Sequence, residues 1–115
     1  MFSDKTRKYR LARSKKDFLT LFGKQQYYVQ KFTFDEVIFV KQESDLYAFR
    51  NKCPHQGAKL IGCWIEDNKV VCPLHQYKFD TQNGRGHGLY LENYKLEENK
   101  DGYFLLRTYF SWFGE

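Results

Sequence analysis

The sequence predicts a single all-β domain. With 115 residues the chain is long enough to build one hydrophobic core of its own. Aromatic residues make up 19% of it, including eleven Phe and nine Tyr, and these residue types favour strands. Short apolar segments alternate with turn-forming residues, without an internal repeat or a low-complexity linker.

Nine segments have the composition of short strands. In chain order they are residues 8–12, 26–34, 36–41, 46–50, 64–66, 70–71, 78–80, 89–96 and 103–109. Turn residues lie between several of them, at 43–45, 67–68, 83–84 and 99–102. Asp101–Gly102 predicts a tight hairpin, because glycine readily adopts the positive backbone dihedral that such a turn requires.

One helix is expected, over residues 14–22. Ser14 can cap its first turn, and Gly23 can end it. The side chains expected to face inward are Phe18, Leu19 and Phe22.

Two Cys/His pairs lie in predicted loops. Cys53 and His55 form the first pair, and Cys72 and His75 form the second after sixteen intervening residues. A zinc finger typically has two cysteines at one end and two histidines at the other, whereas each end here supplies one of each. That arrangement is expected when one iron of a [2Fe–2S] cluster binds both cysteines and the other binds both histidines.

The residues around these pairs, CPHQGAKL and CPLHQYKFD, complete a pattern that resembles the Rieske family. The resemblance extends over roughly residues 7–109 and leaves the tail SWFGE outside. It implies the Rieske fold of small antiparallel sheets, in which residues 7–50 and 89–109 form a base and residues 51–88 an inserted cluster-binding part. It also implies one-electron transfer by one [2Fe–2S] cluster per chain. The implied ligands are Cys53, His55, Cys72 and His75.

The loops also predict the reduction potential. Relatives with high potential have a Ser and a Tyr after the last histidine ligand, whose hydroxyls bond to sulfur, and a disulfide between the loops. Tyr77 and Phe79 occupy the matching positions here, and Leu74 and Lys59 (or its neighbours) stand where the extra cysteines would be. We therefore expect the low end of the family range, roughly −150 mV rather than +300 mV.

Four other residues in this region have structural interpretations. Pro54 and Pro73 each follow a ligand cysteine and should stiffen the loops. Cys63 is interpreted as a small, partly buried apolar residue rather than a ligand. His87 is either a surface-loop histidine or a residue packed over the cluster, where relatives have a proline-containing loop that this chain lacks.

Composition also suggests a compartment. An odd number of cysteines, three, argues against a disulfide framework and for a reducing compartment. We find neither an export signal nor an apolar stretch of membrane-span length, so we expect a cytoplasmic protein without a membrane partner.

The net charge of +5 arises largely from one segment near the N-terminus. Its cations are Lys5, Arg7, Lys8, Arg10, Arg13, Lys15 and Lys16. Three interpretations are open: a solvated arm and first strand, a nucleic-acid contact, and a docking patch for an acidic redox partner. We favour the first and expect no nucleic-acid partner.

The histidine count limits the function. A Rieske oxygenase also needs a mononuclear iron held by two histidines and a carboxylate, but only His87 remains once the cluster is bound. We therefore expect no catalytic site in this chain. The leading function is a monomeric ferredoxin that passes electrons from a reductase to a terminal oxidoreductase such as an oxygenase. The alternatives are a small Rieske subunit of a nitrite-reductase-like enzyme and a zinc-stabilised binding module.

Overall fold

The computed structural model describes residues 2–43, 45–54, 57–73 and 76–112, and over these residues it consists mostly of antiparallel strands. The all-β prediction is therefore confirmed. Contacts divide the chain into two compact units, Met1–Gly23 with Tyr94–Glu115, and Lys24–Asn93. The sequence-based division into a base (residues 7–50 and 89–109) and a cluster-binding part (residues 51–88) stays a prediction.

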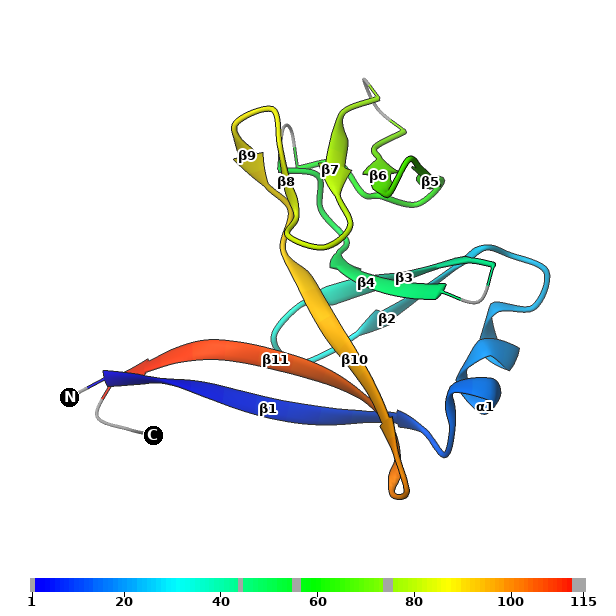
Figure 1. Cartoon of the computed structure of the whole chain (residues 1–115), viewed down its shortest axis with the longest axis vertical. Helices are drawn as coiled ribbons and strands as arrows, with labels where there is room; N and C mark the ends of the chain where they lie inside the picture. Colours follow the sequence, from blue (N-terminus) through cyan, green and yellow to red (C-terminus); the bar gives the residue numbers. More distant parts are fainter. Residues whose placement is uncertain (1, 44, 55–56, 74–75, 113–115) are drawn as a thin grey trace. The chain divides into compact units, whose positions relative to one another are not determined.

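The first unit is built on a long two-stranded ribbon. Strand β1 (Phe2–Ala12) pairs antiparallel with β11 (Gly102–Trp112), from Phe2 opposite Trp112 to Ala12 opposite Tyr103 (Figure 1). On its other edge β11 pairs with β10 (Asn93–Asn99) through the hairpin predicted at Asp101–Gly102. The positive dihedral of that turn belongs to Gly102, with φ 142°.

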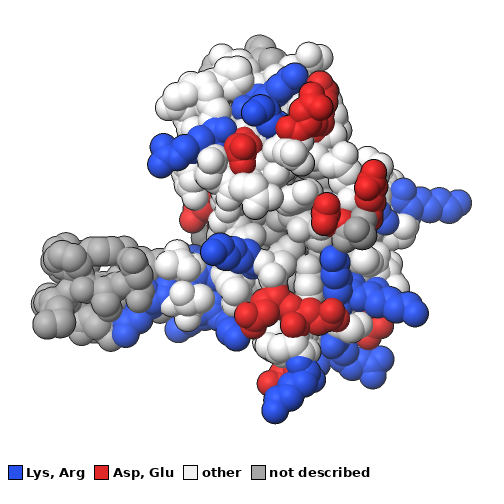
Figure 2. Space-filling model, viewed as in Figure 1, with Lys and Arg blue, Asp and Glu red and all other residues white. Residues whose placement is uncertain are grey.

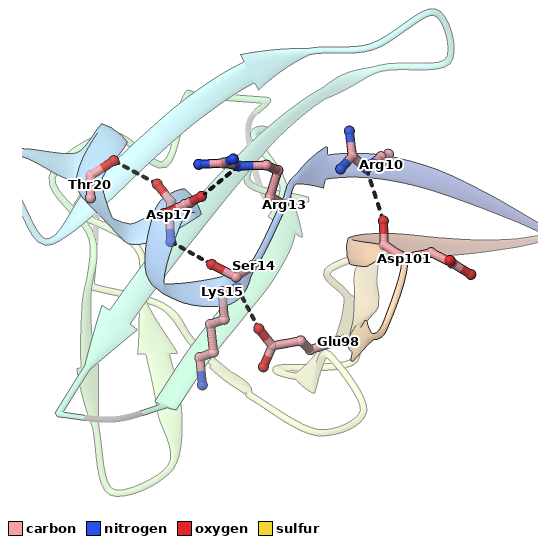
Figure 3. Close-up of polar contacts among 8 residues, drawn as sticks. All are labelled: Arg10, Arg13, Ser14, Lys15, Asp17, Thr20, Glu98 and Asp101. Carbon is pink, nitrogen blue, oxygen red and sulfur yellow. Dashed lines mark hydrogen bonds and ion pairs between the residues drawn. The ribbon is translucent and has the colours of Figure 1, made fainter.

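The helical segment begins where it was predicted to begin. The side chain of Ser14 accepts a hydrogen bond from the Asp17 N–H (3.1 Å) and caps α1 (Lys15–Leu19), as Figure 3 shows. The last turn is the 3₁₀ helix η1 (Thr20–Phe22), and Gly23 follows it with φ 58°. Phe18 is fully buried, 5.6 Å from the ring centroid of Tyr103, so this helix packs on β11. Phe22 is also buried, whereas Leu19 is only partly buried.

The second unit begins with a three-stranded antiparallel meander. Strands β2 (Tyr27–Lys31), β3 (Glu36–Gln42) and β4 (Asp45–Arg50) pair in sequence order. The central strand β3 supplies four consecutive buried residues, Val37 to Val40, as expected for a strand covered on both faces.

Short strands make up the remainder of this unit. Strands β5 (Trp64–Glu66), β6 (Lys69–Val71) and β7 (Lys78–Asp80) form a small sheet, and β8 (Arg85–Gly86) and β9 (Leu89–Tyr90) form a hairpin. Both two-residue turns have positive φ at each position: 51° and 61° at Asp67–Asn68, and 56° and 73° at His87–Gly88. These values are typical of type I′ turns, which match the twist of the paired strands.

The prediction of one strand over residues 89–96 was wrong. The chain leaves strand geometry between Tyr90 and Asn93. There the Leu91 N–H donates to the carbonyl of Gly84, and the carbonyl of Glu92 accepts from the Arg50 N–H. Because these backbone groups bond to partners in a loop and at the end of a strand, the predicted strand over residues 89–96 is divided into β9 and β10.

Several cations of the basic N-terminal segment have partners within the first unit. Lys8 pairs with Glu97 (2.8 Å) and Arg13 with Asp17 (3.3 Å), while Arg10 donates to the carbonyl of Asp101. Figure 2 shows acidic side chains lying beside basic ones on the face drawn. Among the described residues, no helix is long and apolar enough to cross a membrane.

Candidate metal centre

The first candidate ligand loop begins at Cys53 and is closed by its own backbone. The Cys53 N–H donates to the carbonyl of Ala58 (2.7 Å), and the Gly57 N–H donates back to the carbonyl of Cys53 (2.7 Å). Gly57 has φ 74°, a conformation that glycine adopts at no steric cost. The described residues Cys53, Gly57 and Ala58 thus bring the two ends of this loop together, and Gly57 permits the close backbone turn expected of it.

Asn51 connects the two ends of this loop to β3. It is 2% exposed, and its Oδ1 accepts from the Leu60 N–H (2.7 Å) while its Nδ2 donates to Glu36 (2.9 Å). The Lys59 ammonium also bonds to Glu36 (2.5 Å). Hydrogen bonds from Lys59 and then from Asn51 lower the pKa of Glu36, so its carboxylate remains charged and anchors the loop.

The second candidate loop begins at Cys72 and is closed in the same way. The Cys72 N–H donates to the carbonyl of Tyr77 (2.8 Å), again five residues along the chain. Gln76, directly before the acceptor residue, has φ 56°. The loops at Cys53 and Cys72 thus have the same length, the same closing bond and the same position of positive φ.

Both cysteine side chains fit a metal-bound role. Cys53 is 2% exposed and Cys72 is 0% exposed, and both belong to one hydrophobic cluster with Leu60 and Phe79. Neither forms a disulfide. Two buried thiols among mostly apolar side chains suit an iron–sulfur cluster, because thiolates are the soft ligands that such iron prefers and burial restricts water.

The predicted ligands His55 and His75 lie outside the described residues, together with Gln56 and Leu74. The ligand role of these two histidines is a prediction from sequence, and of the four predicted ligands the structure describes Cys53 and Cys72.

Cys63 lies in the same cluster but outside the two loops. It is 6% exposed, and burial raises the pKa of its thiol to about 12, with a smaller contribution from Cys72. It therefore stays protonated at neutral pH, in agreement with its interpretation as a small apolar residue.

His87 contacts the end of the second loop, and the predictions did not assign this contact. The residue is exposed, as expected for a surface histidine, yet its ring stacks on that of Tyr77 with centroids 4.6 Å apart. Its Nε2 also accepts from the Lys78 N–H (3.3 Å). The dipeptide His87–Gly88, which suits a type I′ turn, was the only signal in the sequence that could have located it.

A surface hollow of about 280 Å³ adjoins the first loop. Its lining residues are Arg50, Lys52, Cys53, Pro54, Gly57, Tyr90 and Glu92. The walls combine cationic, aromatic and acidic groups beside one candidate ligand.

Known proteins are similar to this chain in sequence. The chain is 36% identical over 52 residues to the ferredoxin component of the alkene monooxygenase system of Xanthobacter autotrophicus, a match covering 44% of this chain and 43% of that protein. It is also 36% identical over 50 residues to the ferredoxin component of the naphthalene 1,2-dioxygenase system of Pseudomonas aeruginosa, covering 44% and 48%. The matched segments thus cover less than half of the length of each of these relatives.

The fold has a counterpart among solved structures. The ferredoxin of carbazole 1,9a-dioxygenase from Nocardioides aromaticivorans superposes with a TM-score of 0.64 at 23% identity, over 86% of this chain and 95% of that one. At this identity the likeness supports the fold.

A family model, the Rieske [2Fe-2S] domain, matches residues 10–93, a narrower range than the 7–109 suggested by the sequence. The match includes both candidate ligand loops, and membership implies one [2Fe–2S] cluster per chain. The chain belongs to the Rieske [2Fe-2S] domain family.

Proposed function

We propose that this chain is a one-electron carrier whose [2Fe–2S] cluster is bound by Cys53, Cys72, His55 and His75. The observation that carries the proposal is the equivalence of the two loops, each with a buried cysteine at its closing bond that is not in a disulfide. A proline directly follows each of these cysteines. A histidine lies two residues after Cys53 and three residues after Cys72.

The bound cluster would supply one-electron redox chemistry, and two neutral imidazoles in place of two thiolates on one iron would raise its potential above that of an all-cysteine cluster. The protein contributes a rigid and largely dry site. Backbone hydrogen bonds close each loop, and Asn51 and Glu36 anchor the first loop to β3. Such preorganisation keeps the ligands in place when the charge of the cluster changes.

We infer that the partners are a reductase, which donates the electron, and a terminal oxidoreductase such as an oxygenase, which accepts it. The names of the relatives support this, because each is a ferredoxin component of an oxygenase system. A reducing cytoplasmic location is part of the proposal, and the three free cysteines agree with it.

The test begins with anaerobic purification of the chain. We expect a brown protein with two irons and two sulfides per chain, and a rhombic EPR signal after reduction. Colourless protein carrying one zinc per chain would refute the proposal in favour of the zinc-stabilised module.

Electron transfer is then measured directly. The oxidised protein is mixed with NADH, a flavin-dependent ferredoxin reductase and cytochrome c as a terminal acceptor. We expect cytochrome c reduction to depend on the chain and to be lost in Cys72→Ala. A loaded protein that never accelerates the reaction would exclude the carrier role and leave a fixed or structural role for the cluster.

A further inference from the structure

A chain of hydrogen bonds connects Cys72 to His87 through one peptide group. The carbonyl of Tyr77 and the N–H of Lys78 belong to the same planar unit. Its oxygen accepts from the Cys72 N–H (2.8 Å), and its N–H donates to Nε2 of His87 (3.3 Å). The backbone of the second ligand loop is therefore linked to an imidazole fifteen residues beyond Cys72.

The His87 ring makes aromatic contacts beside this peptide. It stacks on Tyr77 with an interplanar angle of 29°, and it meets Phe79 edge-on at 6.3 Å. Phe79 is fully buried in the same hydrophobic cluster as Cys72. Thus His87 contacts both the side chain of Tyr77 and the peptide that follows it.

The β8–β9 hairpin is shaped to bring the ring to this position. Gly86 lies so close to β7 that a Cβ on it would be 2.1 Å from the Lys78 carbonyl oxygen. The N–H of Lys78 points to His87 rather than to β6. The β8–β9 hairpin therefore covers backbone polar groups of β7 that would be unpaired if β7 were an open edge strand. His87 also adopts φ 56°, a backbone conformation that is strained for a non-glycine residue.

We propose that His87 is a positioning residue for the cluster: it fixes the peptide that holds the backbone of Cys72. This rests on the proposed function, which takes Cys72 as a cluster ligand. Hydrogen bonds in such a chain polarise one another, so the acceptor at His87 strengthens the closing bond of the loop. Because Nε2 accepts, the proton of the neutral ring resides on Nδ1.

Two variants remove the contact and preserve the turn. His87→Gly eliminates the ring while glycine accepts the positive φ, and His87→Asn keeps a residue that favours this conformation but whose side chain is too short to reach Lys78. Asn68→Gly is the matched control, because Asn68 occupies the same kind of two-residue turn between β5 and β6. Circular dichroism establishes that each variant folds.

Amide hydrogen exchange tests the hydrogen-bond chain with or without a cluster. We expect the amides of Lys78 and Cys72 to exchange about tenfold faster in both His87 variants, the effect of losing one hydrogen bond. The Cys53 amide, which bonds to Ala58 in the other loop, should be unchanged. Unchanged rates at Lys78 and Cys72, or equal acceleration at Cys53, would overturn the proposal.

The reduction midpoint and EPR spectrum of the loaded protein test the effect on the cluster. Both should shift in the His87 variants and remain as in wild type in Asn68→Gly. If the His87 variants have the wild-type midpoint and the wild-type g values, the positioning role is refuted. Failure of the proposed function is distinguishable, because it would appear as absence of a cluster in the wild-type protein itself.

Discussion

Gly57 and Gln76 occupy equivalent positions in the two ligand loops. Each lies four residues after its cysteine, directly before the residue whose carbonyl closes the loop, with φ 74° and 56° respectively. The left-handed conformation is free of strain for glycine and costs a glutamine about 1–2 kcal/mol. At this position the backbone of the second loop is strained, whereas that of the first loop is not.

This equivalence predicts opposite effects of two substitutions. Gln76→Gly should stabilise the protein by about 1 kcal/mol or less, because the relieved strain exceeds the added entropy of the unfolded chain. Gly57→Ala should destabilise it by about 1–2 kcal/mol through its φ, since the nearest atom to the new Cβ is the mobile Lys52 Cε at 3.2 Å. Urea unfolding of both variants measures the effects, and changes of the same sign would contradict the equivalence.

The fold should lose stability in acid partly through Glu36. The bonds from Lys59 and Asn51 lower the pKa of Glu36, so its contribution is complete above the ordinary carboxyl pKa and disappears as pH falls through the lowered value. Glu36→Gln should therefore be less stable at neutral pH and lose less stability between about pH 6 and pH 3. Urea midpoints across this range test it, with Glu43→Gln, an exposed position in the β3–β4 turn, as the control.

Cys63 should be dispensable for cluster binding. Its thiol is buried and un-ionised, and the pKa of about 12 reflects mainly the loss of solvation. We expect Cys63→Ala to bind as much iron as wild type, with the same EPR spectrum and about 1 kcal/mol less stability. Cys72→Ala, which also removes a buried thiol, should bind none. Iron loss in Cys63→Ala would assign it a ligand role.

The reduction midpoint should lie at the low end of the family range, roughly −150 mV. Phe79, fully buried in the same cluster as the cysteines, has no hydroxyl to donate to sulfur, and none of the three cysteines forms a disulfide between the loops. A redox titration followed by EPR gives the value. A clearly positive midpoint would show that other donors stabilise the reduced state.

Much of the fold and site could be predicted from local sequence. The ligand cysteines, their prolines and the turn glycine at Gly57 act within a few residues, as do the Ser14 cap and the Asp101–Gly102 hairpin. These features depend on backbone dihedrals and short-range hydrogen bonds, which residue type largely determines.

Other features depended on residues distant in the chain. Strand β1 begins at Phe2 rather than at Lys8, because β11 pairs with it along its whole length. Sequence alone missed this start, since the polar residues between Phe2 and Lys8 have little strand propensity. Strand β8 has only two residues, Arg85 and Gly86, and neither type favours strands.

Sequence by itself determined the family and the all-β class, and it predicts the four cluster ligands, because a ligand motif requires particular side chains at particular spacings. Tertiary structure alone decided that Asn51 and Glu36 anchor the first loop and that His87 supports the second. These contacts join residues 9 to 15 positions apart, or join a side chain to a peptide in another element. Only the folded chain brings such groups within hydrogen-bonding distance, and no local pattern encodes that proximity.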